Sequence, residues 1–482
     1  MLYYKEFKTH EPIIMGRKKK FDNTIYTFDI ETTSYLILDD KVIEGCKYEK
    51  LSKNKQEESI KQATMYIWQF GINDTIYYGR TWNELIEFIT KLDDVVPYMK
   101  IVFVHNLSFE FQFLCSVFNM SNVMARKSRK VMRADLKDYK IEFRCSYMMS
   151  NCKLEKLAEV YNLDVKKLTG DLDYDKLRHS LTPLNKEELD YCEHDCLVVY
   201  EYIKKELLTY ENVDRIPITS TGHVRRELKN IVVKDFKYKA LVRSAINTDP
   251  HVYNLLIEAF AGGYTHANWI NAGKVIKNIT SYDFTSSYPY VMTTFRFPST
   301  EFKKCNIKRI EDLSSRFAYI IVIKLQNIES KCYNSFLSMS KCKNIKKGEY
   351  DNGRIMSAEE LITTITDVDL KILLKAYNFK YEILECYESL YKYLPKTFID
   401  FVLDKYVKKT EYKGVKNKEL EYQLEKAKFN ALYGMSVTNM IRDDVIYKDG
   451  GWSEIPLTND EIIKALELEK KKAFLSFAYG VW

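Results

Sequence analysis

No apolar run in this sequence is long enough to cross a membrane. The best, Phe317–Ile323, has the length of a single strand, whereas a spanning helix needs about 20 predominantly apolar residues. The N-terminal residues Met1–Lys8 also lack the apolar core of a secretory signal peptide. These absences predict a protein that is neither secreted nor membrane-spanning, with no membrane partner.

Regularly spaced cysteines are missing too. The ten cysteines do not form the paired Cys-x-x-Cys sets of a zinc site, so we interpret them as reduced thiols of a cytoplasmic protein. The sequence contains no internal repeat and no low-complexity tract. What it does contain is a mild basic excess. The net charge of +7 suits a polyanionic partner and equally a solvated basic surface.

The length and composition are those of a globular protein with several domains. A chain of 482 residues is too long for one hydrophobic core, and about three domains or subdomains are expected. Residues 24–210 alternate short apolar strands, such as 25–30 and 101–105, with amphipathic helices, such as 186–208. This alternation predicts an α/β domain.

The remaining sequence changes character several times. A cluster of Pro, Ser, Thr and Gly at 216–223 predicts a linker. Strands, loops and basic residues mix between 297 and 394, and the pattern becomes helical from Phe398, with a clear helix over 419–433. A turn at 449–451 predicts a hairpin.

Two acidic residues stand on one predicted strand. Asp29 and Glu31 share a face because strand side chains alternate with a period of two. Glu110 follows a second apolar strand, and Tyr191 and Asp195 share a helix face at i, i+4. Together the four acids suit two Mg²⁺ or Mn²⁺ ions about 4 Å apart, as phosphodiester hydrolysis requires. The alternative for the first pair is an edge strand with solvated acids.

A second acidic site is predicted near residue 283. Asp283 ends a short run of β-branched and aromatic residues, and Tyr288 begins a new element, fixed by the following proline. An aspartate leaving a strand can hold a divalent metal over triphosphate oxygens, and a nearby aromatic ring can form one wall of a sugar pocket.

A third pattern lies further along the chain. Lys426, Asn430 and Tyr433 form one stripe at i, i+4 and i+7 of a predicted helix. These side chains suit a nucleoside triphosphate. The alternative is an amphipathic surface helix that Gly434 ends as a C-cap.

These segments together resemble a known enzyme family. Ser281–Tyr290 resembles motif A of the family B DNA polymerases, and Lys426–Gly434 resembles their motif B, with Ala431 in place of serine. The three acidic segments resemble the exonuclease motifs of the DEDD 3′–5′ proofreading domain, except that Glu110 stands where that family has aspartate. The resemblance implies an α/β chain with a ribonuclease H-like exonuclease domain. An incomplete family B palm and fingers domain with insertions would follow it.

The resemblance also implies roles for individual residues. Tyr191 would orient the attacking water, and Lys166 or Lys167 would lie near the scissile phosphate. Tyr288 would exclude a 2′-hydroxyl, Lys426 would support the triphosphate, and Tyr433 would check the nascent base pair. The residues expected to contact DNA are Thr32, His105, Asn106, Phe109, Gly262, Gly263 and Gly434. Phe109 would stack on an unpaired base, unless it is a core aromatic at a strand end.

Compactness and the placement of insertions favour the protein-primed branch of the family, whose members occur in bacteriophages and linear plasmids. Phe260–Gly263 resembles that branch's Tyr-x-Gly-Gly linker motif. The resemblance predicts five parts: an exonuclease domain at 1–215, a linker and first palm segment at 216–296, a first terminal-protein-region-like insertion at 297–394, fingers helices at 395–434, and a second such insertion, a hairpin, with the start of the remaining palm at 435–482.

Basic runs fit a nucleic-acid track. They lie at 17–20, 126–133 and 405–418, where Tyr406 and Tyr412 interleave with lysines. We expect them to meet phosphates as a set, although each alone is also typical of a solvated surface.

The second palm carboxylate of motif C is not found in the sequence. No Tyr-x-Asp-Thr-Asp-Ser string occurs, and Thr366–Asp369 is interpreted as an ordinary helix start. Residues 478–482 resemble the segment just upstream of motif C, so we expect a truncated or split polymerase that does not extend a primer alone. Its expected partners are primer–template and single-stranded DNA, dNTPs, a terminal protein primer and a C-terminal fragment carrying motif C. The alternatives are a stand-alone 3′–5′ exonuclease with a vestigial palm and a non-enzymatic DNA-binding remnant.

Overall fold

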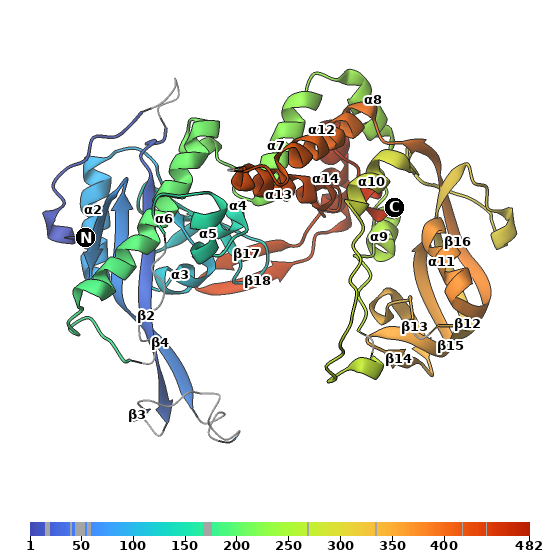
Figure 1. Ribbon diagram of the computed structural model, residues 1–482, viewed down its shortest axis with the longest axis horizontal. Coiled ribbons are helices and arrows are strands. Elements are labelled where there is room, and N and C mark those ends of the chain that lie inside the picture. The colour runs from blue at the N-terminus through green and yellow to red at the C-terminus, as the bar shows by residue number, and fades with distance from the viewer. Residues whose placement is uncertain are drawn as a thin grey trace. The chain divides into compact units, whose positions relative to one another are not determined.

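The computed structural model divides into two units (Figure 1). Unit 1 comprises residues 1–223 and 443–455, and unit 2 comprises 224–442 and 456–482. The structure describes residues 1–14, 20–38, 41–43, 54, 59–166, 176–267, 269–332, 335–416, 418–439 and 441–482. Among them, no helix combines the length and the apolar character that crossing a membrane requires.

Unit 1 is built on a mixed nine-stranded sheet, as the alternating pattern predicts. β2 is antiparallel to β4 but parallel to β6, which is in turn parallel to β9. The predicted strands at 25–30 and 101–105 are confirmed as parts of β2 and β6. In sheet order the strands are β1 (Leu2–Tyr3), β5 (Thr75–Gly79), β4 (Ile60–Ile72), β2 (Tyr26–Leu38), β6 (Lys100–Val104), β9 (Ile141–Cys145), β8 (Val131–Leu136) and β7 (Met120–Ala125), with β3 (Lys41–Ile43) paired to β2.

Helices pack on both faces of this sheet because both faces are apolar. Phe28 of β2 packs in one core with Phe88 of α2 and Phe111 of α3. Ile101 of β6 packs in another with Tyr202 of α6. The helices of this unit are α2 (Trp82–Val95), α3 (Leu107–Leu114), α4 (Ser146–Ser150), α5 (Leu154–Val160) and α6 (Lys186–Tyr210), with short 3-10 turns η1 (Tyr4–Glu6) and η3 (Val213–Arg215).

Helix α6 confirms the predicted helix over 186–208. It begins where the Asn185 side chain accepts a hydrogen bond from the backbone N–H of Glu188, and the Glu188 carboxylate accepts one from the backbone N–H of Asn185. This capping box satisfies two of the helix's unpaired N–H groups. Arg178 also binds Glu188 at 2.8 Å, so the start of α6 is anchored to the chain before it.

A hairpin from far along the chain completes unit 1. β17 (Asp444–Lys448) and β18 (Gly451–Ile455) confirm the hairpin predicted from the turn at 449–451. The rings of Tyr447 and Trp452 lie 5.1 and 5.8 Å from the ring of Phe111 on α3. Ser128 donates two hydrogen bonds to Glu454, at 3.0 Å from its backbone N–H and 2.8 Å from its hydroxyl.

Unit 2 combines a helical core with a second sheet. Phe429 and Leu432 of α13 pack with Phe398 of α12 and Met292 of α10. The predicted helix over 419–433 is confirmed as α13. The helices are α7 (Ser220–Val232), α8 (Phe236–Ser244), α9 (Pro250–Ala259), α10 (Ser287–Thr294), α11 (Asp367–Ala376), α12 (Lys396–Tyr412), α13 (Glu419–Ser436), α14 (Asn459–Lys472) and α15 (Ala478–Val481), with turns η4 (Trp269–Asn271), η5 (Ile310–Asp312) and η6 (Met339–Lys341).

The second sheet is antiparallel and has seven strands. Its central strand, β12, confirms the strand predicted at 317–323, and its core includes Ile321, Ile323 and Leu361. The helix start predicted at Thr366–Asp369 is confirmed, because the Thr366 hydroxyl caps α11 at the N–H of Asp369. In order the strands are β10 (Arg296–Pro298), β16 (Tyr377–Tyr393), β12 (Phe317–Ser330), β15 (Arg354–Thr366) and β13 (Cys342–Lys346), with β11 (Lys303–Lys304) on β16 and β14 (Glu349–Asp351) on β15.

Candidate active site

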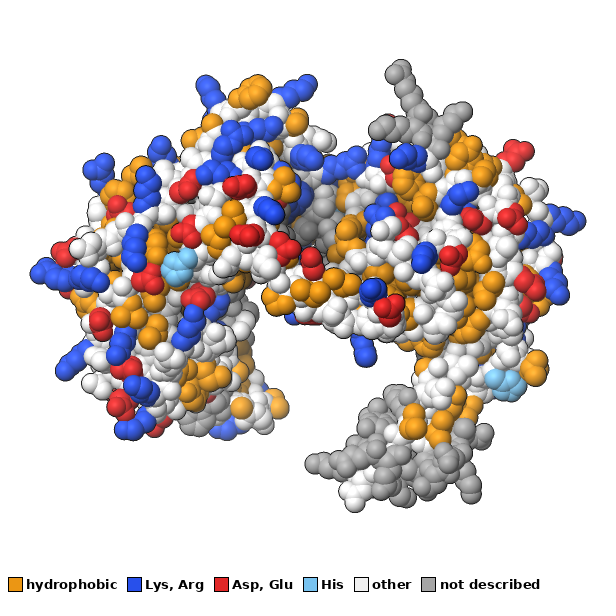
Figure 2. All heavy atoms as spheres, turned by 180° about the vertical axis from the view of Figure 1, so that it is seen from behind, with side chains coloured by type: hydrophobic (Ala, Val, Ile, Leu, Met, Phe, Trp, Pro, Cys, Tyr) orange, Lys and Arg blue, Asp and Glu red, His pale blue; other side chains and the backbone are white. Residues whose placement is uncertain are grey.

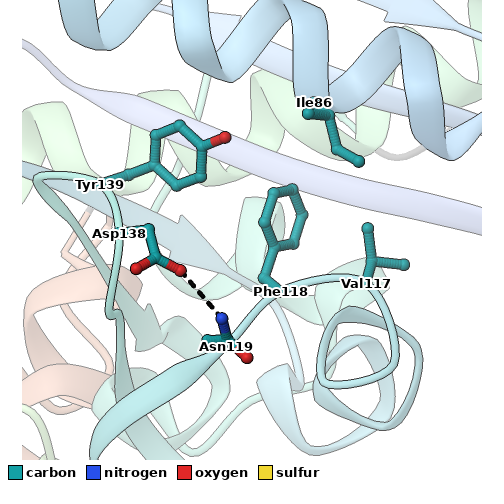
Figure 3. Close-up of a pocket in the computed structure, with 6 residues that line it drawn as sticks. All are labelled: Ile86, Val117, Phe118, Asn119, Asp138 and Tyr139. Atoms are coloured by element: carbon teal, nitrogen blue, oxygen red, sulfur yellow. Dashed lines mark hydrogen bonds between the residues drawn. The ribbon is translucent and has the colours of Figure 1, made fainter.

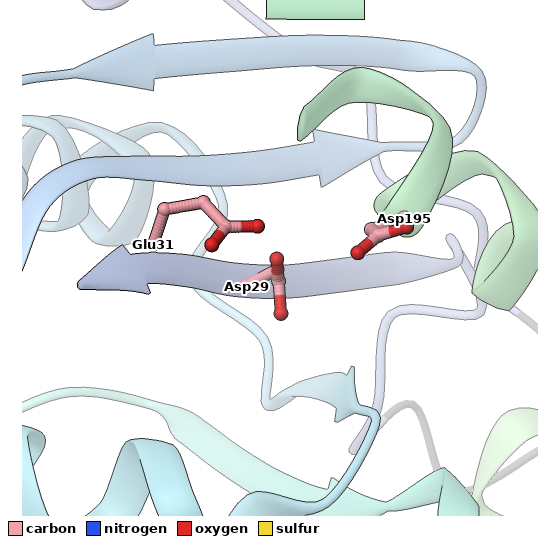
Figure 4. Close-up of side chains that lie close together, drawn as sticks. All are labelled: Asp29, Glu31 and Asp195. Atoms are coloured by element: carbon pink, nitrogen blue, oxygen red, sulfur yellow. The ribbon is translucent and has the colours of Figure 1, made fainter. Parts of the chain in front are cut away.

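Three carboxylates converge in unit 1. Asp29 and Glu31 extend from one face of β2, and Asp195 extends toward them from α6 (Figure 4). One oxygen from each lies within 4.8 Å of the other two. Carboxylates at this separation repel one another unless a cation lies between them. Mg²⁺ and Mn²⁺ both prefer oxygen ligands, so these residues fit either ion.

Glu110, the fourth predicted acid, lies outside this group of three. It is on the first turn of α3 and only 3% exposed. Burial raises the pKa of its carboxyl well above the ordinary range, the residue's own backbone N–H opposes the shift, and the charge of Glu31 adds to it. Its Oε2 has no hydrogen-bond partner among the described residues. Burial therefore favours the protonated form of the Glu110 carboxyl in the metal-free protein.

Replacing this carboxyl by an amide should make the metal-free protein more stable at alkaline pH. The raised pKa means that the unfolded state loses its Glu110 proton before the folded state does, so stability is lost as pH rises from the ordinary glutamate range through the folded pKa. Glu110→Gln removes this loss. In melts with a chelator, the variant and the wild type should coincide below about pH 4.5. As the pH rises further, the variant's Tm should exceed the wild type's by about 2–4 °C for each kcal/mol of unfolding free energy that the substitution restores. A difference in Tm between the variant and the wild type that does not increase with pH would contradict the raised pKa of Glu110.

Three of the residues expected to contact DNA lie at or next to the junction of β6 and α3, and a fourth, Thr32, lies on β2. Asn106 adopts a left-handed conformation with φ of 74°, a value that asparagine tolerates better than most residues. Phe109 is 41% exposed, so the alternative of a core aromatic is wrong. His105 Nδ1 lies 3.0 Å from the hydroxyl oxygen of Ser146. Thr32 lies at a register shift between β2 and β4, directly after Glu31.

Tyr191 shares a face of α6 with Asp195, as the i, i+4 spacing predicts. Its ring packs with Tyr66, Ile67 and Cys192 and is largely buried. The described part of the chain thus brings Tyr191 to the same strand–helix junction as the three carboxylates. Its role in orienting water stays a prediction.

The segment around Asp283 differs from the prediction. The sequence predicts a strand ending at Asp283, but residues 274–284 form neither helix nor strand and are exposed. Val275 and Tyr282 are 94% and 92% exposed. A strand needs a neighbour for its backbone N–H and C=O groups, and the described residues pair no strand with this segment. Within the described residues, Asp283 belongs to no group of three or more metal-ligating side chains.

Two of the predicted nucleotide-binding side chains lie together beside α13. The rings of Tyr288 and Tyr433 stack, with centroids 4.2 Å apart and an interplanar angle of 24°. Lys426 and Asn430 are exposed on the same helix. Gly434 is not a C-cap, because α13 continues to Ser436.

The glycines of the predicted linker motif lie in an exposed loop after α9. A methyl group added at Gly263 would lie 3.0 Å from the hydroxyl of Tyr288, whereas Gly262 has open space around it. Gly263 therefore lies against one of the two stacked tyrosines.

Comparison with known proteins places this chain in a family. The family model described as DNA polymerase type B, organellar and viral, matches residues 169–478. The chain belongs to this family. A curated relative, a probable DNA polymerase of Ascobolus immersus, is 31% identical over 144 residues. That match covers 29% of this chain and only 11% of the relative, so it spans about a tenth of the relative's length.

The fold of this chain is similar to that of phi29 DNA polymerase. The match to the phi29 ternary complex with primer–template DNA and incoming nucleotide covers 94% of this chain and 76% of the phi29 chain, with a TM-score of 0.61 at 18% identity. The match to the phi29 complex with single-stranded DNA covers 93% of this chain and 76% of the phi29 chain, with a TM-score of 0.64 at 17% identity. The mixed α/β fold class expected from the sequence is confirmed.

Some residues of the predicted basic runs are paired with acidic side chains. Lys405 is 3% exposed and forms ion pairs with Glu227 and, at 3.8 Å, with Glu425, so the expectation that it meets phosphates is wrong. Arg133 binds Asp135 at 3.4 Å and Glu142 at 3.0 Å. Figure 2 shows Lys and Arg side chains intermingled with Asp and Glu over the visible face. Lys167 and residues 17–19 lie outside the described residues.

One lysine of these runs lies beside the motif A segment, and sequence reasoning did not single it out. Lys409 of α12 donates a hydrogen bond to the hydroxyl of Ser286 at 3.0 Å, and its ammonium lies 4.6 Å from the ring centroid of Phe429. Burial lowers its pKa, and the charges of Lys413 and Lys426 lower it further. Lys405 and Lys409 are four residues apart, so the sequence indicates that they share one face of the helix. It does not indicate which of the two pairs with acidic side chains.

Exchanging the two lysines for methionine should separate their roles. Lys405→Met removes the buried ammonium that pairs with Glu227 and leaves Glu227 its ion pair with Lys428 at 3.3 Å. Removing one partner of a buried pair costs up to about 3–5 kcal/mol. Lys409→Met should leave the melting curve nearly unchanged while weakening binding of a fluorescent dNTP in Mg²⁺. Comparable melting temperatures for the two variants would contradict this division.

Unit 1 contains a cavity of about 130 Å³ whose lining residues differ from the three convergent carboxylates (Figure 3). Asn119 donates a hydrogen bond to Asp138 at 3.0 Å at its edge, beside Phe118 and Tyr139. None of its lining residues belongs to the group of Asp29, Glu31 and Asp195. We therefore assign it no part in the chemistry of the acidic site.

Proposed function

We propose that this chain is the exonuclease and palm–fingers part of a protein-primed type B DNA polymerase that edits DNA 3′ ends during replication. The convergence of Asp29, Glu31 and Asp195 from β2 and α6 carries the proposal. Three carboxylates are costly to hold this close, and the site they form suits two divalent cations. The buried Glu110 beside them completes the predicted acidic set.

The chemistry of such a site is hydrolysis of the terminal phosphodiester. Bound Mg²⁺ or Mn²⁺ supplies an activated water and charge stabilisation at the leaving 3′ oxygen. Asp29, Glu31 and Asp195 would hold the ions, and the Tyr191 hydroxyl would orient the water. The exposed ring of Phe109 would stack on the unpaired terminal base, a contact that tolerates any base.

The assay that tests this proposal is the trimming of single-stranded DNA labelled at its 5′ end. We expect shortening from the 3′ end in Mg²⁺ or Mn²⁺, and none with a chelator. Phi29 DNA polymerase, whose fold this chain shares, has been observed with single-stranded DNA, which supports the choice of substrate. Absence of trimming under all conditions would favour a non-enzymatic DNA-binding remnant.

Unit 2 supports a second activity of the same enzyme. The stacked Tyr288 and Tyr433, with Lys426 on the same helix, suit an incoming dNTP paired to a primer–template. Synthesis also needs a second palm carboxylate beside Asp283. We infer that it comes from a polypeptide carrying motif C. The two predicted terminal-protein-region-like parts, at 297–394 and 435–482, would serve a protein primer. The five predicted parts and cytoplasmic replication remain proposals, since the family includes organellar members.

A stand-alone 3′–5′ exonuclease with a vestigial palm is the second candidate. The observation that favours it is the contrast between the two acidic sites. Unit 1 gathers three carboxylates, whereas Asp283 is exposed on a segment that pairs with no strand of the described residues. Restoration of synthesis by an added polypeptide decides between the two candidates.

A further inference from the structure

Gln69 lies on β4, the strand that pairs with the strand bearing Asp29 and Glu31. In the antiparallel register Gln69 is directly opposite Asp29, and Ile67 is opposite Glu31. Directly opposed residues extend to the same face, with Cβ atoms about 4.5–5.5 Å apart. The Gln69 side chain therefore leaves the sheet beside Asp29, on the face that α6 covers with Asp195.

The amide of Gln69 is fully buried and makes no hydrogen bond in the described part of the protein. The exposed fraction of the residue is 0%, and neither Nε2 nor Oε1 has a partner. Buried polar groups in folded proteins are almost always hydrogen-bonded, because leaving them unpaired is costly. Packing alone would favour leucine or methionine here. The amide therefore points to a partner that is bound at the acidic site.

Two buried thiols of the neighbouring helix do not supply that partner. Cys192 and Cys196 of α6 are both buried. Burial raises the pKa of both thiols, and the negative charge of Asp29 raises them further, which shows that they lie close to this carboxylate. Thiols are weak donors and weak acceptors, so they do not satisfy an amide.

We propose that Gln69 is a positioning residue of the metal site. Its Oε1 accepts a hydrogen bond from a water molecule bound to a cation, and its Nε2–H donates to the Asp29 carboxylate. This inference rests on the proposed exonuclease function. Groups that orient metal ligands through hydrogen bonds typically contribute about 10–100-fold to metal affinity. An amide suits both tasks because it carries a donor and an acceptor.

The experiment compares Mn²⁺ binding and metal-free stability in Gln69→Leu. Free Mn²⁺ is measured by electron paramagnetic resonance, and the site is identified as the binding lost in Asp195→Asn. We expect Gln69→Leu to weaken this binding about 10–100-fold. Its Tm with a chelator should rise by about 2–4 °C, because an unpaired buried amide is removed. Gln62→Leu, an exposed glutamine of the same strand, should change neither value.

The possible outcomes separate this proposal from the proposed function. Unchanged Mn²⁺ affinity in Gln69→Leu, with binding still lost in Asp195→Asn, overturns the role of Gln69 and leaves the metal site intact. A lower metal-free Tm together with weaker binding also overturns it, since Gln69 would then support the fold. No Mn²⁺ bound at the wild-type site overturns the exonuclease proposal itself.

Discussion

The double variant Asp29→Ala, Glu31→Ala should trim single-stranded DNA at least about 1,000-fold more slowly than the wild-type chain. Both β2 carboxylates of the convergent group disappear, and Asp195 alone cannot hold two cations. Metal ions contribute several kcal/mol to stabilising such transition states, and each 1.36 kcal/mol is a factor of ten in rate. The measurement is the single-turnover rate of shortening of a 5′-labelled oligonucleotide in saturating Mg²⁺.

A matched control removes the same charge elsewhere in unit 1. Glu155 and Glu159 are exposed on α5 and belong to no metal-ligating group among the described residues. The variant Glu155→Ala, Glu159→Ala should trim at nearly the wild-type rate. The acidic-site variant should also melt no lower than the wild type with a chelator, because repulsion between the carboxylates is relieved. Wild-type trimming by the Asp29, Glu31 variant would remove the basis of the exonuclease proposal.

Local periodicity predicted the parts of this site that lie on single elements. The alternation of β2 places Asp29 and Glu31 on one face, and the helix period of α6 places Tyr191 and Asp195 on one face. The helix period likewise predicted α13, and the turn at 449–451 predicted the hairpin β17–β18. In each case the information lies within about one element of sequence, so a single pattern was sufficient.

Features that depend on distant neighbours could not be predicted in this way. The hairpin packs its Tyr447 and Trp452 against Phe111, a residue more than 300 positions earlier. The pairing of Gln69 with Asp29 depends on a register between β2 and β4 that the sequence does not state. The burial of Lys405 depends on Glu227, which comes from α7. Non-local contacts of this kind are set by the fold as a whole.

The error at Asp283 has the same physical origin. Its β-branched and aromatic neighbours have strand propensity, but propensity reflects a side chain packed on a paired sheet rather than a property of the backbone alone. Phe284 is exposed, and no partner strand is present among the described residues. The sequence therefore predicted a strand from propensity alone. A strand forms only where another strand pairs with it, and the described residues supply no such partner.

Primer extension should be undetectable with this chain alone and should appear when a polypeptide carrying a Tyr-x-Asp-Thr-Asp-Ser strand and a thumb is added. That strand would pair with the exposed segment of residues 274–284 and place a second carboxylate beside Asp283. Phosphoryl transfer needs both acids, because the two metal ions stabilise the attacking and leaving oxygens together. We expect the added polypeptide to raise extension at least about 1,000-fold, as the gain of a metal site worth several kcal/mol implies.

The assay uses the Asp29→Ala, Glu31→Ala background so that trimming does not consume the primer. Asp283→Asn in that background should abolish the restored extension, whereas Asp460→Asn, an exposed acid on α14, should not. Asp283→Asn with the acidic site of unit 1 intact should still trim DNA at the wild-type rate, since Asp283 lies in unit 2. Extension by the chain alone would mean that the second carboxylate lies within these 482 residues. Failure of every motif C polypeptide to restore synthesis would instead favour the stand-alone exonuclease, because Asp283 would then have no acid with which to share a metal.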